Sequence, residues 1–324
     1  MKIVLVYRKK MKGRYSLENV FDSLVPHIRT QHNIRVYLTG GWMCLIKDIF
    51  NLRSMKCDIY HVIGDINYFS IFLPKNKTIL TIPDVGHYIY DLKNLRKILY
   101  KWLWIKLPIF FAYKVTTISE FSKKKISNII NRKKLQVEVI PCCYSSDLIF
   151  FKKKLDKKNI KILFIGTGYN KNFTKLIEAV KFTNWKITVI GNQSFSDKML
   201  LEKYGISYTN LKNVNFNKII EAYKRSDILC FISLHEGFGL PVIEANASGT
   251  PVIASNIEPI NLIAGNAACL VNPKSTKDIK RNIIKIVNND NFRKKLILKG
   301  LKNVKKYHPS IIAKQYLKIY EMFL

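Results

Sequence analysis

Two glutamates flank a glycine-rich turn in the stretch FISLHEGFGLPVIEANASGTPVIASN, residues 231–256. Glu236 opens the turn, and seven residues separate it from Glu244. The apolar run before the turn predicts a strand, while Pro241 and Gly249 predict the start and the end of a helix. The first N–H groups of a helix have no partner within it, and the helix dipole attracts negative charge to that end. This stretch therefore predicts a site for an anion and a sugar.

Strands and helices alternate along the chain that carries this stretch. Continuous apolar runs of strand length, which are typical of buried parallel strands, recur throughout. In the first half they occupy residues 3–7, 34–38, 59–63, 78–82, 115–118 and 137–140, and in the second half residues 160–165, 186–190, 228–234, 252–255 and 269–271. A charged, aperiodic segment at 150–159 predicts a linker. The sequence thus predicts an α/β protein with two doubly wound sheets, whose ligand we expect between the domains, at the carboxyl ends of the strands.

The bulk composition limits the classes of protein without choosing one. Apolar residues form 48% of the 324 residues, which suits folded cores and argues against disorder. The formal net charge is +33, because 55 Lys and Arg oppose 22 Asp and Glu. Such an excess suits nucleic acid, an anionic membrane face or phosphorylated substrates as partners. An AT-rich coding sequence would produce the same bias towards Lys, Asn and Ile, so the charge alone does not identify a partner.

Cysteines, the amino terminus and metal-ligand patterns point to a cytoplasmic protein without a bound metal. None of the six cysteines forms a CxxC pair, and they predict buried thiols in a reducing compartment. The first run, MKIVLVYRKK, is too short for a signal peptide. The longest apolar stretch, residues 102–113, is interrupted by Lys106 and Pro108 and is too short to span a bilayer. Because the sequence has neither a suitable DxD motif nor a His/Cys cluster, we expect no metal ion.

The stretch around the two glutamates resembles the donor-site signature of the family-4 retaining glycosyltransferases, which have the GT-B fold. The resemblance rests on the E-x7-E spacing, the G-F-G turn, and the strings GTPVIASN and AACLVNP that follow. It implies two Rossmann-like domains that face a central cleft, with a C-terminal helix that packs back on the first domain. We therefore expect an acceptor-binding domain at residues 1–150, a nucleotide-sugar-binding domain at 151–307 and the returning helix at 308–324.

The resemblance assigns roles to the residues of the glycine-rich turn. Glu236 would lie beside the donor sugar, and Glu244 would accept hydrogen bonds from the ribose hydroxyls of the nucleotide. Backbone N–H groups of the turn would contact the sugar or the diphosphate, from Gly237, Phe238, Gly239 and Leu240. Two simpler interpretations stay open: Glu236 as a solvent-exposed turn acid, and Glu244 as an acid that the helix dipole favours.

A second glycine-bearing loop, which reads GTGYNKN, follows the first strand of the second domain. By the resemblance, Gly166 and Gly168 would approach the donor phosphates, and Lys171 would neutralise the diphosphate as it leaves. A fixed cation at that place stabilises the charge that develops in the transition state. The family often has an Arg/Lys pair here, whereas this chain has no arginine in the loop. Lys171 could instead be one of 55 basic residues without a special role.

Further candidate residues come from the first domain. Asp84 and His87 follow the fourth predicted strand, where many relatives have a His-Asp pair. Facing the donor, either could orient or deprotonate an acceptor hydroxyl, although Asp84 could instead cap a turn and His87 could have no task. Arg14, in the first loop, would approach donor phosphate or an anionic acceptor. Leu262 and Asn266 stand where the family commonly has acidic residues, so details of the donor pocket are left open.

The segment LRKILYKWLWIKLPIFF, residues 95–111, combines basic residues with Trp102 and Trp104. One interpretation places it on an anionic bilayer, where the acceptor would be a lipid-linked glycan. The other packs its apolar face on the first sheet, because helices must cover a parallel sheet.

Together these residues predict a metal-independent retaining glycosyltransferase. It would take a sugar from a nucleotide-diphosphate sugar and pass it to a glycan or lipid-linked acceptor, as in cell-surface polysaccharide assembly. We expect it in the cytoplasm or as a peripheral protein on the inner face of the membrane, with no nucleic-acid partner and no cofactor besides the donor.

Two alternatives stay open. Another GT-B enzyme, such as a nucleotide-sugar epimerase, would need an acid/base cluster around the sugar carbon, and we find none in the sequence. A non-catalytic basic protein that binds polyanions or nucleic acid would need aromatic residues interleaved with Lys and Arg on one exposed face.

Overall fold

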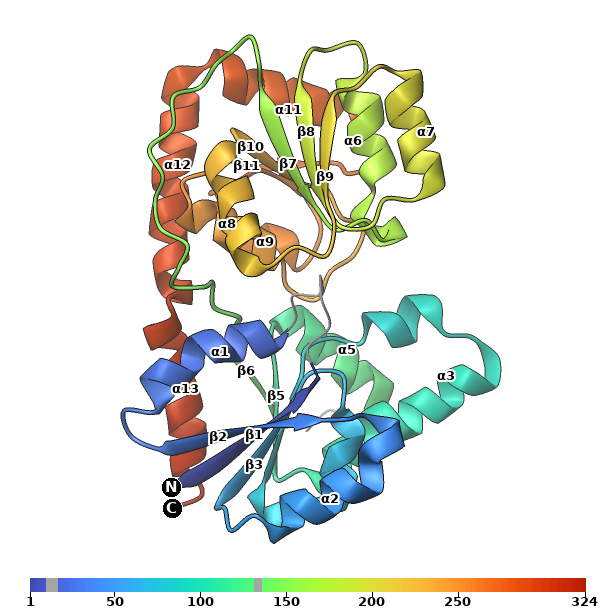
Figure 1. The fold of residues 1–324 in the computed structure, drawn as a ribbon, viewed down its shortest axis with the longest axis vertical. Coiled ribbons are helices and arrows are strands. Elements are labelled where there is room, and N and C mark those ends of the chain that lie inside the picture. Colours follow the sequence, from blue (N-terminus) through green and yellow to red (C-terminus); the bar gives the residue numbers. More distant parts are fainter. Residues whose placement is uncertain (10–16, 131–135) are drawn as a thin grey trace. The chain divides into compact units, whose positions relative to one another are not determined.

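The computed structural model of the chain describes residues 1–9, 17–130 and 136–324. Its residues group into two compact units. The first contains the described residues up to Cys143 together with Pro309–Leu324, and the second contains Tyr144–His308. Each unit holds one parallel β-sheet with helices packed against it (Figure 1).

The first sheet has six strands in the order β2-β1-β3-β4-β5-β6, and every pairing is parallel. The strands are β1 (Lys2–Arg8), β2 (Asn33–Thr39), β3 (Ile59–Ile63), β4 (Thr78–Ile82), β5 (Lys114–Thr117) and β6 (Val137–Val139). The α-helices of this unit are α1 (Leu17–Ile28), α2 (Leu45–Ser54), α3 (Asn94–Tyr100), α4 (Leu107–Phe111), α5 (Glu120–Ile130) and α13 (Pro309–Glu321). Strands β3 and β4 are buried at every position, as their continuous apolar runs predict.

The second sheet also has six parallel strands, in the order β12-β11-β10-β7-β8-β9. The strands are β7 (Lys161–Ile165), β8 (Lys186–Ile190), β9 (Tyr208–Leu211), β10 (Ile228–Phe231), β11 (Val252–Ser255) and β12 (Cys269–Val271). The α-helices are α6 (Phe173–Val180), α7 (Phe195–Lys203), α8 (Phe216–Arg225), α9 (Leu240–Ala247), α10 (Ile260–Ala264), α11 (Thr276–Asn288) and α12 (Asp290–Val304). The chain builds outward from β7 on one side and from β10 on the other, so the switch point of the sheet lies between these two strands.

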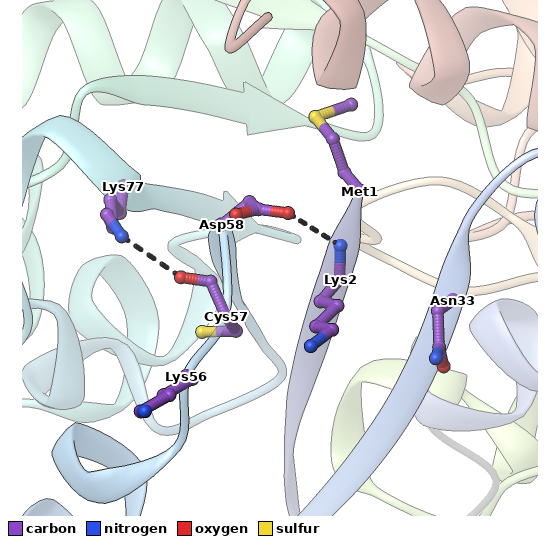
Figure 2. Close-up of a pocket in the computed structure, with 7 residues that line it drawn as sticks. All are labelled: Met1, Lys2, Asn33, Lys56, Cys57, Asp58 and Lys77. Carbon is purple, nitrogen blue, oxygen red and sulfur yellow. Dashed lines mark hydrogen bonds between the residues drawn. The ribbon is translucent and has the colours of Figure 1, made fainter.

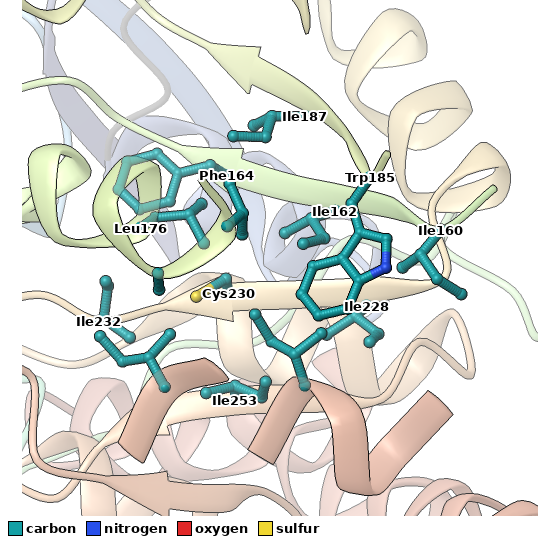
Figure 3. Packing of buried hydrophobic residues seen from close by; sticks show 14 of the residues in the cluster. Ile160, Ile162, Phe164, Leu176, Trp185, Ile187, Ile228, Cys230, Ile232 and Ile253 are labelled. Atoms are coloured by element: carbon teal, nitrogen blue, oxygen red, sulfur yellow. The ribbon is translucent and has the colours of Figure 1, made fainter. Parts of the chain in front are cut away.

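Branched apolar side chains fill the core of the second unit (Figure 3). Ile162 and Phe164 of β7 pack with Cys230 of β10 and Ile253 of β11, and Trp185 closes the cluster before β8. All six cysteines are free thiols, and five of them are buried, as their places in apolar runs predict. The expected doubly wound α/β architecture is confirmed in both units.

The last helix, α13, belongs to the first unit, although the whole second unit precedes it in the chain. It packs against α1, where the rings of Phe21 and Tyr316 lie 4.8 Å apart. Tyr320 is hydrogen-bonded to His61 at 2.8 Å, and the other ring nitrogen of His61 bonds to Thr81 at 2.7 Å. Burial lowers the pKa of His61 to about 3, so the imidazole is neutral and its hydrogen bonds tie α13 to β3 and β4.

The predicted strand at 228–234 is three residues longer than the observed one, and β9 and α7 are among the elements that were not predicted. The run over 228–234 leaves the sheet after Phe231, because the Leu234 amide donates to the Asn170 carbonyl oxygen (2.7 Å) instead of a strand neighbour. The edge strand β9 is partly exposed and polar, so it lacks the apolar run that marks a buried strand. Helix α7 has little apolar periodicity, and its signal is a capping box at Ser194.

The segment 95–111 is not one helix. Helix α3 is followed by a π-helical turn and then by α4, which has Pro108 in its first turn, where a missing N–H is tolerated. Ile105 and Ile109 are buried, as the packing interpretation predicts, while Trp102 is exposed on the other face. The packing interpretation is thus confirmed for one face, and the membrane interpretation stays a prediction for the exposed face.

Candidate functional site

The carboxyl ends of β7 and β10 lie side by side at the switch point of the second sheet. We call residues 166–172, which follow β7, the β7 loop and residues 232–239, which follow β10, the β10 loop. Besides the backbone bond described above, two side-chain contacts join them. The amide of Asn170 donates to the His235 carbonyl oxygen at 3.2 Å, and the Tyr169 hydroxyl lies 3.0 Å from His235 Nε2. The two loops therefore form one connected surface.

The same loops bring Lys171 and Glu236 together. Lys171 Nζ donates to Glu236 Oε1 at 2.5 Å, and the two side chains are 23% and 14% exposed. Gly166 has a φ of 87°, and a Cβ atom there would lie 2.8 Å from Lys171 Cε, so the lysine stem crosses the loop where glycine leaves room. The Lys171 amide donates to the Gly168 carbonyl oxygen at 2.8 Å, which closes the loop into a turn. Two residues that we predicted separately, one for the diphosphate and one for the sugar, thus form an ion pair.

The glycine-rich turn leaves backbone amides free at the start of α9. Gly237 continues the turn, and Gly239 precedes the helix with a φ of 117°, a conformation that favours glycine. The Phe238 side chain is buried, and its ring meets the Tyr307 ring edge-on at 5.8 Å. Within the part of the chain that the structure describes, the amides of Phe238, Gly239 and Leu240 have no hydrogen-bond acceptor. These amides and the dipole of α9 suit an anion or sugar hydroxyls.

Glu244 is a buried carboxylate in α9 and is 8% exposed. The Tyr223 hydroxyl donates to Glu244 Oε2 at 2.8 Å. Among the described residues, no ion pair or hydrogen bond reaches the other oxygen, Oε1. Burial raises the pKa of Glu244 to about 7, and the bond from Tyr223 opposes this only in part. Because a buried carboxylate without a cation costs stability, its presence here indicates a binding role.

Asp84 and His87 lie at the carboxyl end of β4 in the first unit. Asp84 Oδ1 accepts a hydrogen bond from the Gly86 amide at 2.8 Å, so this residue caps a turn, which was one of its two interpretations. His87 Nδ1 pairs with Asp91 Oδ2 at 3.0 Å, and these side chains are 56% and 41% exposed. Neither residue lies in the same unit as the β7 and β10 loops, and Arg14 lies outside the described residues.

Asp65 follows β3, next to β4, and was not among the predicted site residues. Although its side chain reaches solvent, the surrounding protein reduces its hydration and raises the pKa of its carboxyl group, while Arg8 and His87 oppose the shift. The carboxyl ends of β1, β3 and β4 thus gather charged groups of both signs. A charged residue directly after a buried strand was the signal that could have identified Asp65.

Tyr223 was not among the predicted site residues. It lies in α8 and is fully buried, with its hydroxyl on Glu244. A tyrosine in an apolar helix stripe reads as a core residue, but a buried hydroxyl needs a partner. Asn172 was missed as well, and its side-chain amide donates to the Ile232 and Pro273 carbonyl oxygens at 3.2 and 2.7 Å. It therefore ties the β7 loop to the end of β10.

A pocket in the first unit lies at the amino ends of the strands of the first sheet, opposite to the carboxyl ends that carry Asp65 and Asp84 (Figure 2). It is lined by Met1, Lys2, Asn33, Lys56, Cys57, Asp58 and Lys77. The Lys2 amide donates to Asp58 Oδ2 at 2.8 Å, and Lys77 Nζ donates to the Cys57 carbonyl oxygen at 3.1 Å. Because open α/β sheets bind ligands at the carboxyl ends of their strands, we assign no site to this pocket.

Residues 1–9, 17–130 and 136–324 contain no group of three or more His, Cys, Asp or Glu side chains arranged to hold a metal ion. Each of the helices among them is too short or too polar to cross a bilayer.

The model for the family "Glycosyl transferases group 1" matches residues 145–303. Over 255 residues, the chain is 29% identical to the O-antigen chain mannosyltransferase RfbU of Salmonella typhimurium. The match covers 74% of this chain and 67% of that protein. Over 229 residues, it is 23% identical to the O-antigen chain mannosyltransferase B of Escherichia coli. This match covers 64% of this chain and 60% of that protein. The matches thus span about two thirds or less of these relatives.

Among solved structures, Alr3699/HepE of Anabaena in complex with UDP and glucose resembles the chain with a TM-score of 0.80 and 14% identity. The match covers 99% of this chain and 100% of that one. At this identity the likeness concerns the fold.

Proposed function

We propose that this chain, which has the GT-B fold, is a group 1 glycosyl transferase and that it transfers a sugar from a nucleotide-diphosphate sugar to a growing cell-surface glycan, with retention of the anomeric configuration. The donor would bind at the β7 and β10 loops of the second unit. Two relatives named for O-antigen mannosyl transfer support glycan assembly as the process. None of the relatives reported above is named as an epimerase or a nucleic-acid-binding protein, so the two alternatives gain no support.

One observation carries the donor assignment, namely the buried carboxylate of Glu244. Tyr223 occupies Oε2, which leaves Oε1 for a ligand. An ionised carboxylate only accepts hydrogen bonds, so the vicinal hydroxyls of a ribose are chemically suited to it. Lys171 would meet the diphosphate, and the free amides of Phe238 and Gly239 would meet the sugar. The cation and the helix dipole would then stabilise the charge that grows on the leaving group.

A thermal-shift panel tests the donor assignment and identifies the donor. UDP-, GDP-, dTDP- and CMP-sugars would each be added to the wild-type protein and to the Glu244→Gln variant. At 100 times its dissociation constant, a ligand adds about 2.7 kcal/mol to the free energy of unfolding, so the donor should raise the wild-type melting temperature by several degrees. Mannose donors come first because two relatives are named as mannosyltransferases. A panel without any shift would contradict the proposal.

The first unit would hold the acceptor, a glycan or a lipid-linked glycan. Asp65, Asp84 and His87 lie at the carboxyl ends of the neighbouring strands β3 and β4. Carboxylate and imidazole groups can orient or deprotonate a sugar hydroxyl. Transfer assays with the identified donor and a series of acceptor glycans test this part, because variants here should change acceptor KM and leave donor KM unchanged.

An anionic membrane surface is a further partner in this proposal, because two neighbouring segments of the first unit expose apolar faces. In α3 and the turn after it, exposed apolar residues recur at helical spacing, at Leu95, Ile98, Leu99 and Trp102. In α2 and the turn before it, they are Trp42, Met43, Ile46 and Phe50. The rings of Trp42 and Trp104 lie 5.5 Å apart, so the two faces are neighbours.

Basic residues accompany these apolar residues along the same stretches of sequence. They are Lys47, Arg53, Lys93, Arg96, Lys97 and Lys101. Of the acids in the same segments, Asp48 is buried and Asp91 is exposed. Exposed apolar residues accompanied by basic ones suit an anionic bilayer. The protein would therefore work as a peripheral protein on the inner face of the membrane.

Vesicle co-sedimentation tests the membrane proposal. The wild-type protein should sediment with vesicles that contain phosphatidylglycerol more than with pure phosphatidylcholine, and added salt should weaken the binding. The double variant Ile98→Ser/Trp102→Ser should lose most of it. The matched control, Phe182→Ser, removes an exposed apolar side chain from the second unit and should bind as the wild type does. Equal binding by all three proteins would contradict the proposal.

A further inference from the structure

Lys171 cannot be the full counter-ion of Glu236 and of a diphosphate at the same time. Its ammonium group carries one positive charge, and in this structure that charge is paired with the Glu236 carboxylate at 2.5 Å. A nucleoside diphosphate would bring at least two negative charges to the same loops. An ionised carboxylate beside it only repels these charges, and the repulsion is strong where little water screens it.

The geometry allows Lys171 to exchange one partner for the other. Its stem lies across Gly166, in the loop that we expect to contact the phosphates, so the stem can stay in place while the head group turns. The Nζ atom also lies 5.3 Å from the centre of the Phe231 ring, which attracts the cation without forming a directional bond. Both members of the ion pair keep some exposure, so a ligand can reach them.

We propose that Glu236 competes with the diphosphate for Lys171 and thereby promotes release of the nucleoside diphosphate after transfer. This inference rests on the function proposed above. While the nucleotide sugar is bound, Lys171 binds the diphosphate, and the sugar hydroxyls donate hydrogen bonds to Glu236. After transfer the sugar has left with the acceptor, so Glu236 has lost its ligand partner and recaptures Lys171. The site then binds the product more weakly than it would with Lys171 free, although the terminal phosphate of the product carries more negative charge than the diphosphate of the donor.

Calorimetric binding of UDP and GDP to four proteins tests the competition. These are the wild type, Glu236→Gln, Lys171→Met and the double variant. Glu236→Gln frees the lysine, so it should bind the nucleoside diphosphate about tenfold more tightly than the wild type, as expected for removal of one competing charge. Lys171→Met should bind it more weakly, and Glu236→Gln should gain less on the Lys171→Met background than on the wild type, because only the direct repulsion is then removed. The nucleoside monophosphates UMP and GMP, which lack the second phosphate, should gain less from Glu236→Gln.

A matched control comes from a second ion pair in the same unit. Lys175 Nζ donates to Glu178 Oε2 at 2.7 Å on α6, so Glu178→Gln makes the same change of charge outside the two loops. It should bind nucleoside diphosphate as the wild type does. Glu236→Asp keeps the charge but shortens the reach to Lys171, and its affinity should lie between those of the wild type and Glu236→Gln.

The outcomes separate the two proposals. If Glu236→Gln or Glu236→Asp folds with a wild-type melting temperature and binds nucleoside diphosphate no more tightly than Glu178→Gln, the competition is wrong, and the proposed function stands. If the wild type responds to none of the UDP-, GDP- and dTDP-sugars in the thermal-shift panel, the function proposed above is itself wrong. Tighter product binding by Glu236→Gln that shrinks several-fold on the Lys171→Met background supports the competition, whereas an equal gain on both backgrounds shows direct repulsion alone and contradicts it.

Discussion

The two sheets share a six-stranded parallel design, yet their carboxyl ends differ. In the second unit, the β7 and β10 loops bind each other, Lys171 pairs with Glu236, and Tyr223 holds the buried Glu244. In the first unit, Asp65, Asp84 and His87 reach solvent, and His87 forms its ion pair with Asp91, four residues further along the chain. A site whose side chains are held before the ligand arrives suits a ligand of fixed shape, whereas exposed groups can adapt to different ligands. The contrast supports a defined donor in the second unit and an acceptor at the first.

Of the substitutions that test this contrast, Glu244→Gln should have the largest effect on use of the donor. The variant loses the charge on the carboxylate that we propose accepts from the ribose hydroxyls, and hydrogen bonds to charged groups contribute about 1.5–3 kcal/mol each. We therefore expect kcat/KM for the donor to fall by about 100-fold or more, with acceptor KM unchanged. Steady-state transfer kinetics measure this. If the folded variant has the donor KM of the wild type, Glu244 does not contact the donor.

The same substitution should stabilise the protein at alkaline pH. The carboxyl group titrates near 4.5 in the unfolded chain and near 7 in the folded one, so the folded state binds more protons between these values. This residue therefore lowers the free energy of unfolding as pH rises from about 4.5 to 7. Relative to the wild type, Glu244→Gln should gain about 2 kcal/mol between pH 5 and pH 8, measured by urea unfolding. His61 titrates in the opposite sense, with stability rising between about 3 and 6.5, and cancels in the difference.

Lys171→Met should have the next largest effect. Removing one fixed donor or cation from a developing negative charge typically costs about 100-fold in turnover. We expect kcat to fall by about that factor, with acceptor KM unchanged. A change confined to acceptor affinity would contradict the role of this lysine. Lys175→Met, on the neighbouring helix α6, is the matched control and should retain wild-type turnover.

Tyr223→Phe tests whether the hydrogen bond from Tyr223 positions Glu244 for the donor, and its effect on donor KM should be smaller. Without the hydroxyl, Glu244 loses a hydrogen bond worth about 1–1.5 kcal/mol, so donor KM should rise about tenfold while kcat changes less. Since that bond lowers the pKa of Glu244, its removal should move the midpoint of donor binding to higher pH. A pH profile of donor binding measures the shift, which a loss of packing alone would not cause. Tyr204→Phe, elsewhere in the second unit, should leave the profile unchanged.

Asp84→Asn should have the smallest effect. Asparagine keeps an oxygen that can accept from the Gly86 amide, so the turn is preserved while the charge is removed. We expect transfer to fall by less than about threefold, with the change in acceptor KM, because an exposed group makes weak contacts. A large fall in donor binding would contradict the assignment of the donor to the second unit and of the acceptor to the first.

Much of the second sheet could be predicted from local pattern. The runs at 186–190, 252–255 and 269–271 coincide with β8, β11 and β12 at both ends. Continuous apolar runs bounded by glycine or proline suffice to locate strands that are buried on both faces. The partly exposed β9 escaped, because an edge strand of polar residues, Tyr208–Leu211, has no such run.

The candidate site could be predicted in composition but not in its contacts. Glycines after strands located both loops, and the acid spacing identified Glu236 and Glu244. The exposed faces of the segment 95–111 depended on where the π-helical turn rotates the chain, which the apolar periodicity did not show.

By itself, the sequence determined the α/β class, the two glycine loops and the residue types at the site, because strand runs, turns and helix starts are written in neighbouring residues. Only the tertiary structure decided that Lys171 meets Glu236, 65 positions away, and that Tyr223 meets Glu244, 21 positions away. Such contacts depend on strand order and loop conformation. These follow from the packing of the whole sheet, and no local pattern encodes them.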